Sequence, residues 1–196
     1  MRIHEPSWKS YMVTSTDPVF SIDECKKLTE AGRSLPPIDA LIGTDSQETK
    51  KTKKDHGIRR TDIAWLPFTK LPWVYARLEH WMHSVNNKHM GFSQLQIGEM
   101  AQFTFYSKKH HYDWHSDSAY EMSKEPVVRK MSMITLLNDP KEFEGGELQL
   151  VSDRKTVALK QGYGVFFASF IAHRVLPVKK GTRTSLTVWF GGPPLV

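Results

Sequence analysis

Two residues in the segment Trp114-His115-Ser116-Asp117 are the first candidates for chemistry. We expect a strand over 113–118, and because side chains alternate along a strand, His115 and Asp117 would share one face. His173, at the start of a later expected strand, is the best-placed third ligand. Two histidines and one carboxylate leave adjacent positions of a metal open, an arrangement that suits non-haem Fe(II) and oxygen chemistry. A His-x-Asp pair alone is weak support in a chain with nine histidines.

A second group of polar residues strengthens this interpretation. Arg183 comes ten residues after His173, and Ser185 and Thr187 follow it at alternate positions of an expected strand. An arginine with a neighbouring hydroxyl forms a charge-assisted receptor for a carboxylate. A metal triad beside such a receptor predicts an organic diacid that chelates the metal at its other end.

Several motifs around these residues match one family. Tyr106 and Tyr112 stand nine and three residues before His115. Further along the chain come Gly145-Gly146-Glu147-Leu148, His173-Arg174-Val175-Leu176-Pro177, and the strand Arg183 to Phe190. With these features the chain resembles the Fe(II)- and 2-oxoglutarate-dependent oxygenases, in particular their prolyl-4-hydroxylase-like branch, from about Val19 to Gly192.

The resemblance implies a role for each matched residue. His115, Asp117 and His173 would bind Fe(II), and Arg183 would hold the far carboxylate of 2-oxoglutarate, with Ser185 or Thr187 assisting. Tyr106 would add a hydroxyl to a cosubstrate carboxylate, although it could also be a packed strand tyrosine. The implied cosubstrates are 2-oxoglutarate and O2, with ascorbate as a further candidate. The implied reaction is hydroxylation of proline in a peptide or protein, with release of succinate and CO2.

The resemblance says less about the substrate. Arg129 is similar to an arginine that touches the target peptide in this branch, and Trp189 to an aromatic that packs on the target proline; Tyr112 is a further candidate. Plain alternatives are a surface charge for Arg129 and core packing for Trp189. The basic segment Gly43 to Arg60 corresponds to a region that often closes over the substrate in this branch, and its lysines could attract an acidic peptide or only keep a loop solvated.

Two other functions remain as alternatives. One is the same chemistry on a free amino acid, a small metabolite or another protein side chain. The other is a nucleic-acid dealkylase or a basic nucleic-acid-binding protein, which the net charge of +6 invites. Against the latter, Trp189 stands where the dealkylase branch carries a second arginine, and the run Lys50 to Lys54 has no interleaved aromatic for base stacking.

Two positions depart from the family pattern. Lys109 stands where the family often has a glycine, and Leu136 stands where an aromatic is sometimes found. The second departure would leave Tyr106 with more of the cosubstrate binding.

The elements that must position these residues divide the chain in two. Ser21 and Glu24 form a capping box for a helix that fades near Gly32, and a second helix begins near Pro72 and ends before Gly91. Short strands rich in aromatic and branched residues follow from about Gln94, punctuated by Gly, Asn and Pro. We expect them near 96–106, 113–118, 130–138, 146–151, 155–159, 164–168, 173–178 and 183–190.

Together these elements predict an α+β protein, mainly β, with a double-stranded β-helix (jelly-roll) core and N-terminal helical support. The 196 residues suit a single domain, 1–196, with the helical support over about 19–92 and the core over about 94–192. One cysteine excludes a disulfide framework, and no apolar run suits a membrane span or a signal peptide. The expectation is a soluble cytoplasmic protein without a membrane partner, whose oligomeric state the sequence leaves open.

Overall fold

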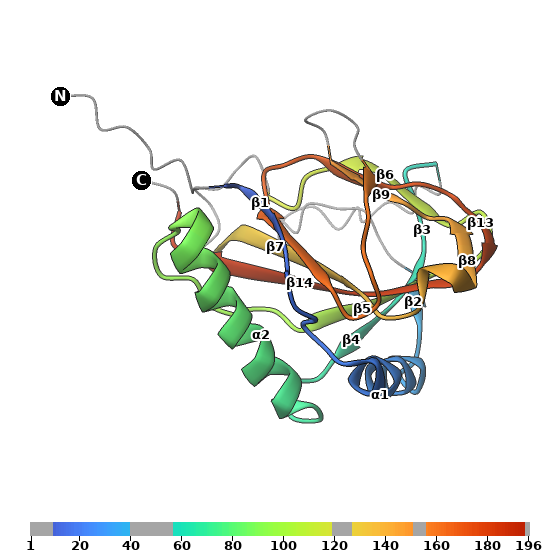
Figure 1. Cartoon of the computed structure of the whole chain (residues 1–196), viewed down its shortest axis with the longest axis horizontal. Helices are drawn as coiled ribbons and strands as arrows, with labels where there is room; N and C mark the ends of the chain where they lie inside the picture. The colour runs from blue at the N-terminus through green and yellow to red at the C-terminus, as the bar shows by residue number, and fades with distance from the viewer. Residues whose placement is uncertain (1–9, 40–56, 119–126, 151–155, 195–196) are drawn as a thin grey trace, which may run out of the picture.

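A computed structural model describes residues 10–39, 57–118, 127–150 and 156–194. Two antiparallel sheets face each other, and α1 and α2 lie on the outer side of the larger one (Figure 1). The strands of the larger sheet follow the order β1-β11-β7-β14-β5-β4-β2, and those of the smaller sheet the order β10-β9-β12-β6-β3. The expected class, α+β and mainly β, is confirmed.

The bounds of the helices and strands are β1 Met12–Thr14, α1 Ile22–Arg33, β2 Ile38–Asp39, β3 Arg59–Arg60, β4 Asp62–Leu66, α2 Pro72–Val85, β5 Ala101–Tyr106, β6 His111–His115, β7 Val128–Leu136, β8 Phe143–Gly145, β9 Leu148–Leu150, β10 Thr156–Val157, β11 Gly164–Ala168, β12 His173–Val175, β13 Val178–Gly181 and β14 Arg183–Gly192. Two short helical turns, Asn86–Met90 and Pro140–Glu142, complete the series.

Helix α1 begins at the capping box that the sequence predicts. The Ser21 hydroxyl accepts a hydrogen bond from the Glu24 amide, and the Glu24 carboxylate accepts one from the Ser21 amide. The helix lays Leu28 and Gly32 against the larger sheet, where the absence of a side chain at Gly32 leaves room for the Phe103 ring. Arg77 of α2 donates to the Glu24 carboxylate at 3.1 Å, which links the two helices.

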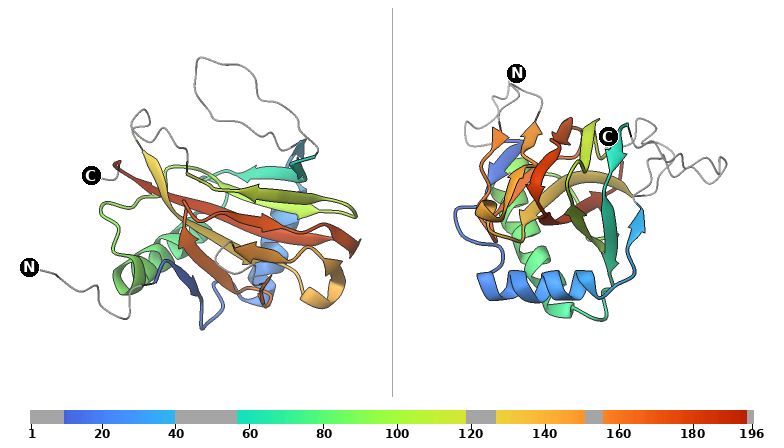
Figure 2. Two further views of the ribbon diagram at one scale, coloured as in Figure 1. Left: turned by 90° about the horizontal axis from the view of Figure 1, so that it is seen from above. Right: turned by 90° about the vertical axis from the view of Figure 1, so that its right-hand side faces the viewer.

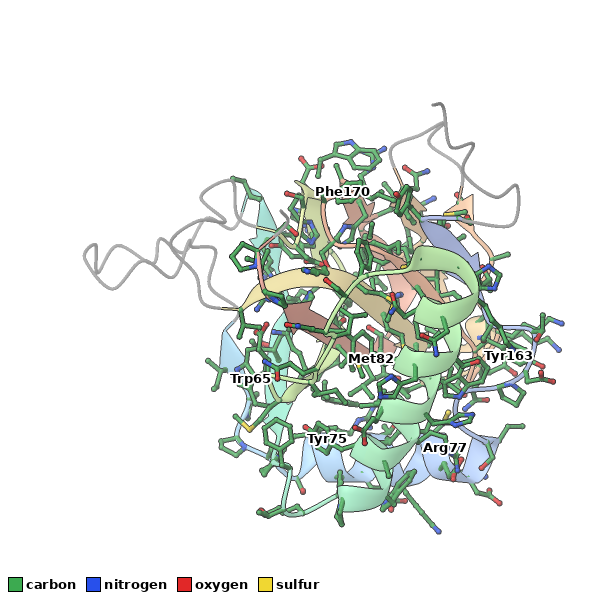
Figure 3. All side chains as sticks on the ribbon, turned by 90° about the vertical axis from the view of Figure 1, so that its left-hand side faces the viewer. Trp65, Tyr75, Arg77, Met82, Tyr163 and Phe170 are labelled. Carbon is green, nitrogen blue, oxygen red and sulfur yellow. The ribbon has the colours of Figure 1, made fainter. Side chains whose placement is uncertain are left out.

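Helix α2 begins at Pro72, as expected, and its apolar stripe packs on the outer face of the larger sheet (Figure 3). The hydroxyl of Tyr75 in its first turn donates to the Leu66 carbonyl and accepts from the Ala101 amide, so α2 is hydrogen-bonded to the start of β5. The helix runs on as one π-helical turn, Asn86–Met90, and ends at Gly91, whose φ of 73° only glycine adopts readily. Among the described residues no helix has both the length and the apolar character to cross a membrane.

Strand β14 is the centre of the larger sheet, with β7 on one side and β5 on the other (Figure 2). Its even-numbered residues Leu186, Val188 and Phe190 pack into the core beneath the helices. The intervening residues therefore face the smaller sheet. They are Arg183, Ser185, Thr187 and Trp189.

Several strand boundaries differ from the sequence-based expectations. The strand expected over 173–178 is two strands, β12 and β13, because the chain bends at Leu176-Pro177 and proline cannot donate to a ladder. Of the strand expected over 96–106, only residues 101–106 form a strand, β5. Gln96, at the expected start, makes an isolated bridge to Gly191. The strand expected over 113–118 is β6, which ends at His115. The short strands β1 to β4 and β8 were not expected at all.

The departure at Lys109 has a conformational counterpart. Its φ is 69°, in the left-handed region where glycine is favoured, and its amide donates to the Val178 carbonyl at 2.8 Å. The lysine therefore keeps the turn between β5 and β6 in the conformation that a glycine would adopt more easily. Of the basic segment expected to be a loop, residues 43–56 lie outside the described residues, while Arg59 and Arg60 form β3, which pairs with β6.

Gly32 generates a testable prediction about stability. A Cβ at this position would lie 2.3 Å from Cγ of the buried Phe103 ring, so we expect Gly32→Ala to destabilise the protein by about 1–3 kcal/mol through overpacking, despite alanine's better helix propensity. Gly98→Ala is the matched control, because its nearest neighbour, Val127 Cγ1, lies at 3.8 Å. Urea unfolding of both variants measures the difference, and equal stabilities would contradict the packing argument.

Candidate metal and cosubstrate site

His115 and His173 lie side by side because their strands pair. β12 runs antiparallel to β6, and in this register His173 is directly opposite His115. Directly opposite residues project their side chains to the same face of a sheet, and the two imidazole centroids are 4.1 Å apart. The pair thus comes from cross-strand register between segments far apart in sequence.

Backbone carbonyls orient both rings. Nδ1 of His115 lies 2.8 Å from the Asp113 carbonyl oxygen, and Nδ1 of His173 lies 3.1 Å from that of Ile171. A protonated Nδ1 donates to a carbonyl, so in each ring Nε2 is left as the atom with a free lone pair. Such hydrogen bonds to the far ring nitrogen are typical of histidines that bind a metal.

Asp117 also lies beside the two histidines, although it is not part of a strand. The expectation that it shares a strand with His115 is wrong, because β6 ends at His115 and the chain bends away. The Asp117 amide donates to the Ser169 carbonyl at 2.9 Å, and the Ser132 hydroxyl donates to Oδ2 of Asp117 at 2.7 Å. The Ser132 and Ser169 hydroxyls lie 2.9 Å apart, and both residues are fully buried. These contacts, not strand alternation, bring the carboxylate to the histidines.

The three side chains form a donor set that fits a divalent metal ion. One ligand atom from each of His115, Asp117 and His173 lies within 4.8 Å of the others. Burial and the neighbouring His173 lower the pKa of His115 to about 3, so its imidazole is neutral at physiological pH. Burial alone would raise the pKa of Asp117, but the two histidines and the Ser132 hydroxyl outweigh burial and hold that pKa below its ordinary value. Neutral imidazoles and an ionised carboxylate are the protonation states that bind metal.

Arg183 lies on the inner face of β14 with 2% of its surface exposed. Its Nη1 donates to the Ser185 hydroxyl at 2.8 Å, and its guanidinium carbon lies 5.5 Å from the centre of the Tyr106 ring. Burial lowers the pKa of Arg183, but guanidinium remains charged in proteins. Within the described parts of the chain no carboxylate pairs with it. A buried cation without an acid partner is costly, so the arrangement fits an anionic ligand.

The neighbours of Arg183 differ in what they offer. Tyr106 lies directly opposite Arg183 in the pairing of β5 with β14, and burial raises the pKa of its phenol, which therefore stays a neutral donor. The Ser185 hydroxyl accepts the hydrogen bond from Arg183. Thr187 lies one inward-facing position further from Arg183 and is only half-buried, so Ser185, not Thr187, lies closest to the guanidinium.

Comparison with known proteins matches the core of the chain to one superfamily. Residues 101–191, from the start of β5 almost to the end of β14, match the model of the 2OG-Fe(II) oxygenase superfamily. The matched segment, just under half of the chain, is therefore similar to this superfamily. The superfamily takes its name from Fe(II) and 2-oxoglutarate, which fit the metal donor set and the buried cation described above.

Curated relatives match part of this chain. A PKHD-type hydroxylase of Shewanella frigidimarina is 29% identical over 92 residues, which cover 44% of the chain and 41% of that protein. A PKHD-type hydroxylase of Azoarcus is 37% identical over 79 residues, which cover 38% of the chain and 35% of that protein. The matched segment therefore spans less than half of these relatives.

Solved structures share the fold over nearly the whole chain. A viral collagen prolyl hydroxylase from Paramecium bursaria Chlorella virus-1, solved with 2-oxoglutarate, has a TM-score of 0.71 at 19% identity and covers 93% of this chain and 97% of its own. A Pseudomonas putida prolyl-4-hydroxylase has a TM-score of 0.67 at 22% identity, with coverages of 92% and 91%. These similarities confirm the jelly-roll architecture.

Stacked cationic and aromatic side chains lie beside the candidate metal site. Tyr112 lies flat on the His115 ring, with centroids 3.4 Å apart and an interplanar angle of 11°. The Arg59 guanidinium lies over the Tyr112 ring, 4.4 Å from its centroid, and donates to the Gln102 side-chain oxygen at 2.9 Å. From the sequence, Arg59 is expected only in a basic loop, because a strand as short as β3 shows no local pattern that would predict its pairing with β6.

Arg129 and Trp189 also lie together near the candidate metal site. The Arg129 guanidinium is 4.0 Å from the Trp189 ring centre, and it forms a bidentate ion pair with Glu99. Trp189 lies opposite Ser132, the residue that donates to Asp117. Its indole Nε1 is buried and makes no hydrogen bond of ordinary geometry among the described residues, but it lies close enough to Asp117 to help lower the pKa of that carboxylate. Glu99 was not predicted from the sequence, since a lone acid before a strand carries no signal of its own.

The hydrogen bond from Ser132 to Asp117 generates the second prediction. Ser132→Ala removes the only hydroxyl that donates to the Asp117 carboxylate among the described residues, so we expect roughly tenfold weaker metal binding with the fold intact. Anaerobic Fe(II) titration measures the affinity, and thermal unfolding checks the fold. Thr135→Val is the control, because Thr135 lies buried on the same strand with its hydroxyl unpaired. Equal metal affinities for Ser132→Ala and the unaltered protein would contradict this role.

Proposed function

We propose that the chain is an Fe(II)- and 2-oxoglutarate-dependent dioxygenase that hydroxylates proline in a peptide or protein, converting 2-oxoglutarate and O2 to succinate and CO2. One observation carries this proposal: a donor set of two histidines and a carboxylate shares the space between the two sheets with a buried arginine that has no acid partner among the described residues. A 2-keto diacid is a molecule that can satisfy both groups at once.

Each residue has a defined task in this reaction. His115, Asp117 and His173 would hold Fe(II), which, with 2-oxoglutarate and O2 bound, supplies the oxidising chemistry. Arg183 and the Ser185 hydroxyl would hold the far carboxylate of 2-oxoglutarate and so fix the direction in which its keto acid end points. The neutral phenol of Tyr106, opposite Arg183, is a further donor to the cosubstrate.

The surroundings of the site exclude water. The inward-facing apolar residues Ile134, Phe167, Leu148 and Val175 form a buried cluster with Tyr106. The edge of the Phe167 ring contacts His173, with centroids 4.7 Å apart. Hydrogen bonds and charge interactions are stronger in such an environment than in water, and reactive species are protected from side reactions.

The substrate assignment rests on Trp189, Arg129 and Tyr112. Trp189 offers a flat apolar ring for a pyrrolidine, and its Nε1 is a donor on the side of the ring near Asp117. Arg129 is held over this ring by Glu99, which also neutralises its charge, so Arg129 suits a neutral backbone better than a free carboxylate. The solved prolyl hydroxylases with the same fold support a peptide partner; one of them, from Trichoplax adhaerens, was solved with a hypoxia-inducible-factor peptide fragment.

The third prediction tests the proposed activity. With Fe(II), 2-oxoglutarate and ascorbate, the purified protein should release succinate, slowly when no prime substrate is present. Asp117→Ala should abolish this release, because the carboxylate is the only anionic metal ligand in the cluster. Asp23→Ala, at an exposed position of α1, should leave the rate unchanged. Succinate release that survives in Asp117→Ala would disprove the metal site.

The fourth prediction concerns the substrate. Mass spectrometry of proline-containing peptides incubated with the enzyme should show the gain of one oxygen atom on proline. We expect Trp189→Leu to raise the KM for such a peptide about tenfold, since it removes an aromatic contact and a donor, while succinate release without peptide persists. Oxygen gain on a free amino acid or metabolite, with every proline peptide unmodified, would instead support the small-molecule alternative.

A further inference from the structure

Thr104 is a buried polar residue that lies outside the metal donor set and makes no contact with Arg183 among the recorded hydrogen bonds. It lies in the middle of β5 with 2% of its surface exposed, and its Oγ1 has no hydrogen-bond partner among the described residues. An unpaired buried hydroxyl destabilises the folded protein relative to a paired one, and native proteins keep few of them. A group of this kind beside a ligand site is a candidate to bind the ligand.

Strand register places Thr104 beside the cosubstrate receptor. In the pairing of β5 with β14, Thr104 is directly opposite Ser185, and Tyr106 is directly opposite Arg183. Opposite residues share a face, so the side chains of these four residues point into the same space. On the other side of β14, Ser185 is opposite Leu136, which brings no polar atom. Thr104 therefore supplies the one additional hydroxyl among the direct cross-strand neighbours of Ser185.

A carboxylate bound by Arg183 could accept a hydrogen bond from the Thr104 hydroxyl as well. Arg183 already donates one N–H to Ser185, so the Ser185 hydroxyl has its own hydrogen free to donate elsewhere. A carboxylate offers about four lone-pair directions, more than the guanidinium alone can fill. A carboxylate held by Arg183 would thus accept from Ser185 and from a further donor on the neighbouring strand.

We propose that Thr104 is a 2-oxoglutarate-binding residue, whose hydroxyl donates to the far carboxylate together with Arg183 and Ser185. This inference rests on the proposed function, because it assumes that 2-oxoglutarate is the anion beside Arg183. It explains why a hydroxyl is kept unpaired in the protein without ligand: the partner arrives with the cosubstrate. It also makes the receptor a composite of two adjacent strands.

The chain contains a matched comparison for Thr104. Thr135 is likewise fully buried in the larger sheet with an unpaired Oγ1. It lies opposite Leu186, on the face that packs beneath the helices, and not on the face of Arg183. Replacing either threonine by valine removes an unpaired hydroxyl at nearly constant volume, but only the change at position 104 removes one from the cosubstrate side.

The test uses Thr104→Val, Thr104→Ser and Thr135→Val in the full chain, with Mn(II) in place of Fe(II) and without O2. Isothermal titration measures the Kd of 2-oxoglutarate, and thermal unfolding without ligand measures stability. We expect Thr104→Val to melt at the same or a higher temperature and to bind 2-oxoglutarate about tenfold more weakly, because a hydrogen bond to a charged group is lost. Thr104→Ser should bind within a few-fold of the unaltered protein, and Thr135→Val should bind equally well.

Each other outcome has a separate meaning. If the unaltered protein binds 2-oxoglutarate and Thr104→Val binds it equally well, Thr104 has no role in binding and the proposed function stands. If Thr104→Ser binds as weakly as Thr104→Val, or if Thr135→Val is also weakened, the effect is one of packing and the inference is overturned. If the unaltered protein binds Mn(II) but not 2-oxoglutarate, the proposed function and the inference both fail.

Discussion

The register of β14 between β5 and β7 is the constraint on which the rest of the structure depends. Its alternation sends Leu186 and Val188 into the core beneath the helices, and Arg183 and Ser185 toward the smaller sheet. A slip of one residue would exchange the two faces, placing a guanidinium among apolar side chains and leucine beside the metal ligands. The apolar residues therefore enforce the position of the polar ones, because burying an unpaired cation in the core would cost far more than the chain's net stability allows.

The interior between the sheets is electrostatically divided. The ionised Asp117 lies among the two histidines, whereas Arg183 lies beside Tyr106 on the larger sheet, and the structure records no ion pair between this aspartate and this arginine. Neither charge is neutralised by the other, so each attracts a ligand of opposite sign. Pairing them directly would stabilise the fold and remove the reason for a metal ion and a dianion to bind. This separation is a cost in stability that serves binding.

The sequence predicts which residues bind the metal and the cosubstrate better than it predicts how the fold brings them together. His115, Asp117 and His173 could be identified because few residue types bind metals, and Arg183 because hydroxyls follow it at strand spacing. The position of the Asp117 side chain could not be predicted. It depends on Ser132 and Ser169, which become neighbours only when β7 and β11 pair. Capping and proline signals located α1 and α2 well, since such signals are local.

Very short strands escaped prediction for the opposite reason. β3 has two residues and β8 has three, too few for an alternation to show, and both exist only through their partners. Arg59 and Glu99 were missed as site residues on the same ground: nothing adjacent to them in sequence marks them. Their positions follow from the pairing of β3 with β6 and from the ion pair to Arg129.

The pairing of β1 with β11 has a consequence for handling the protein. β11, Gly164-Val165-Phe166-Phe167-Ala168, is buried along its whole length. β1 pairs with the edge of β11 that does not face β7, through the pairs Met12↔Phe167 and Thr14↔Val165. Without β1, this apolar strand would become an open edge with unpaired amides and carbonyls, the kind of surface from which chains add to one another into aggregates. A shortened recombinant form that starts after Thr14 would therefore lose solubility before it lost any residue of the metal site.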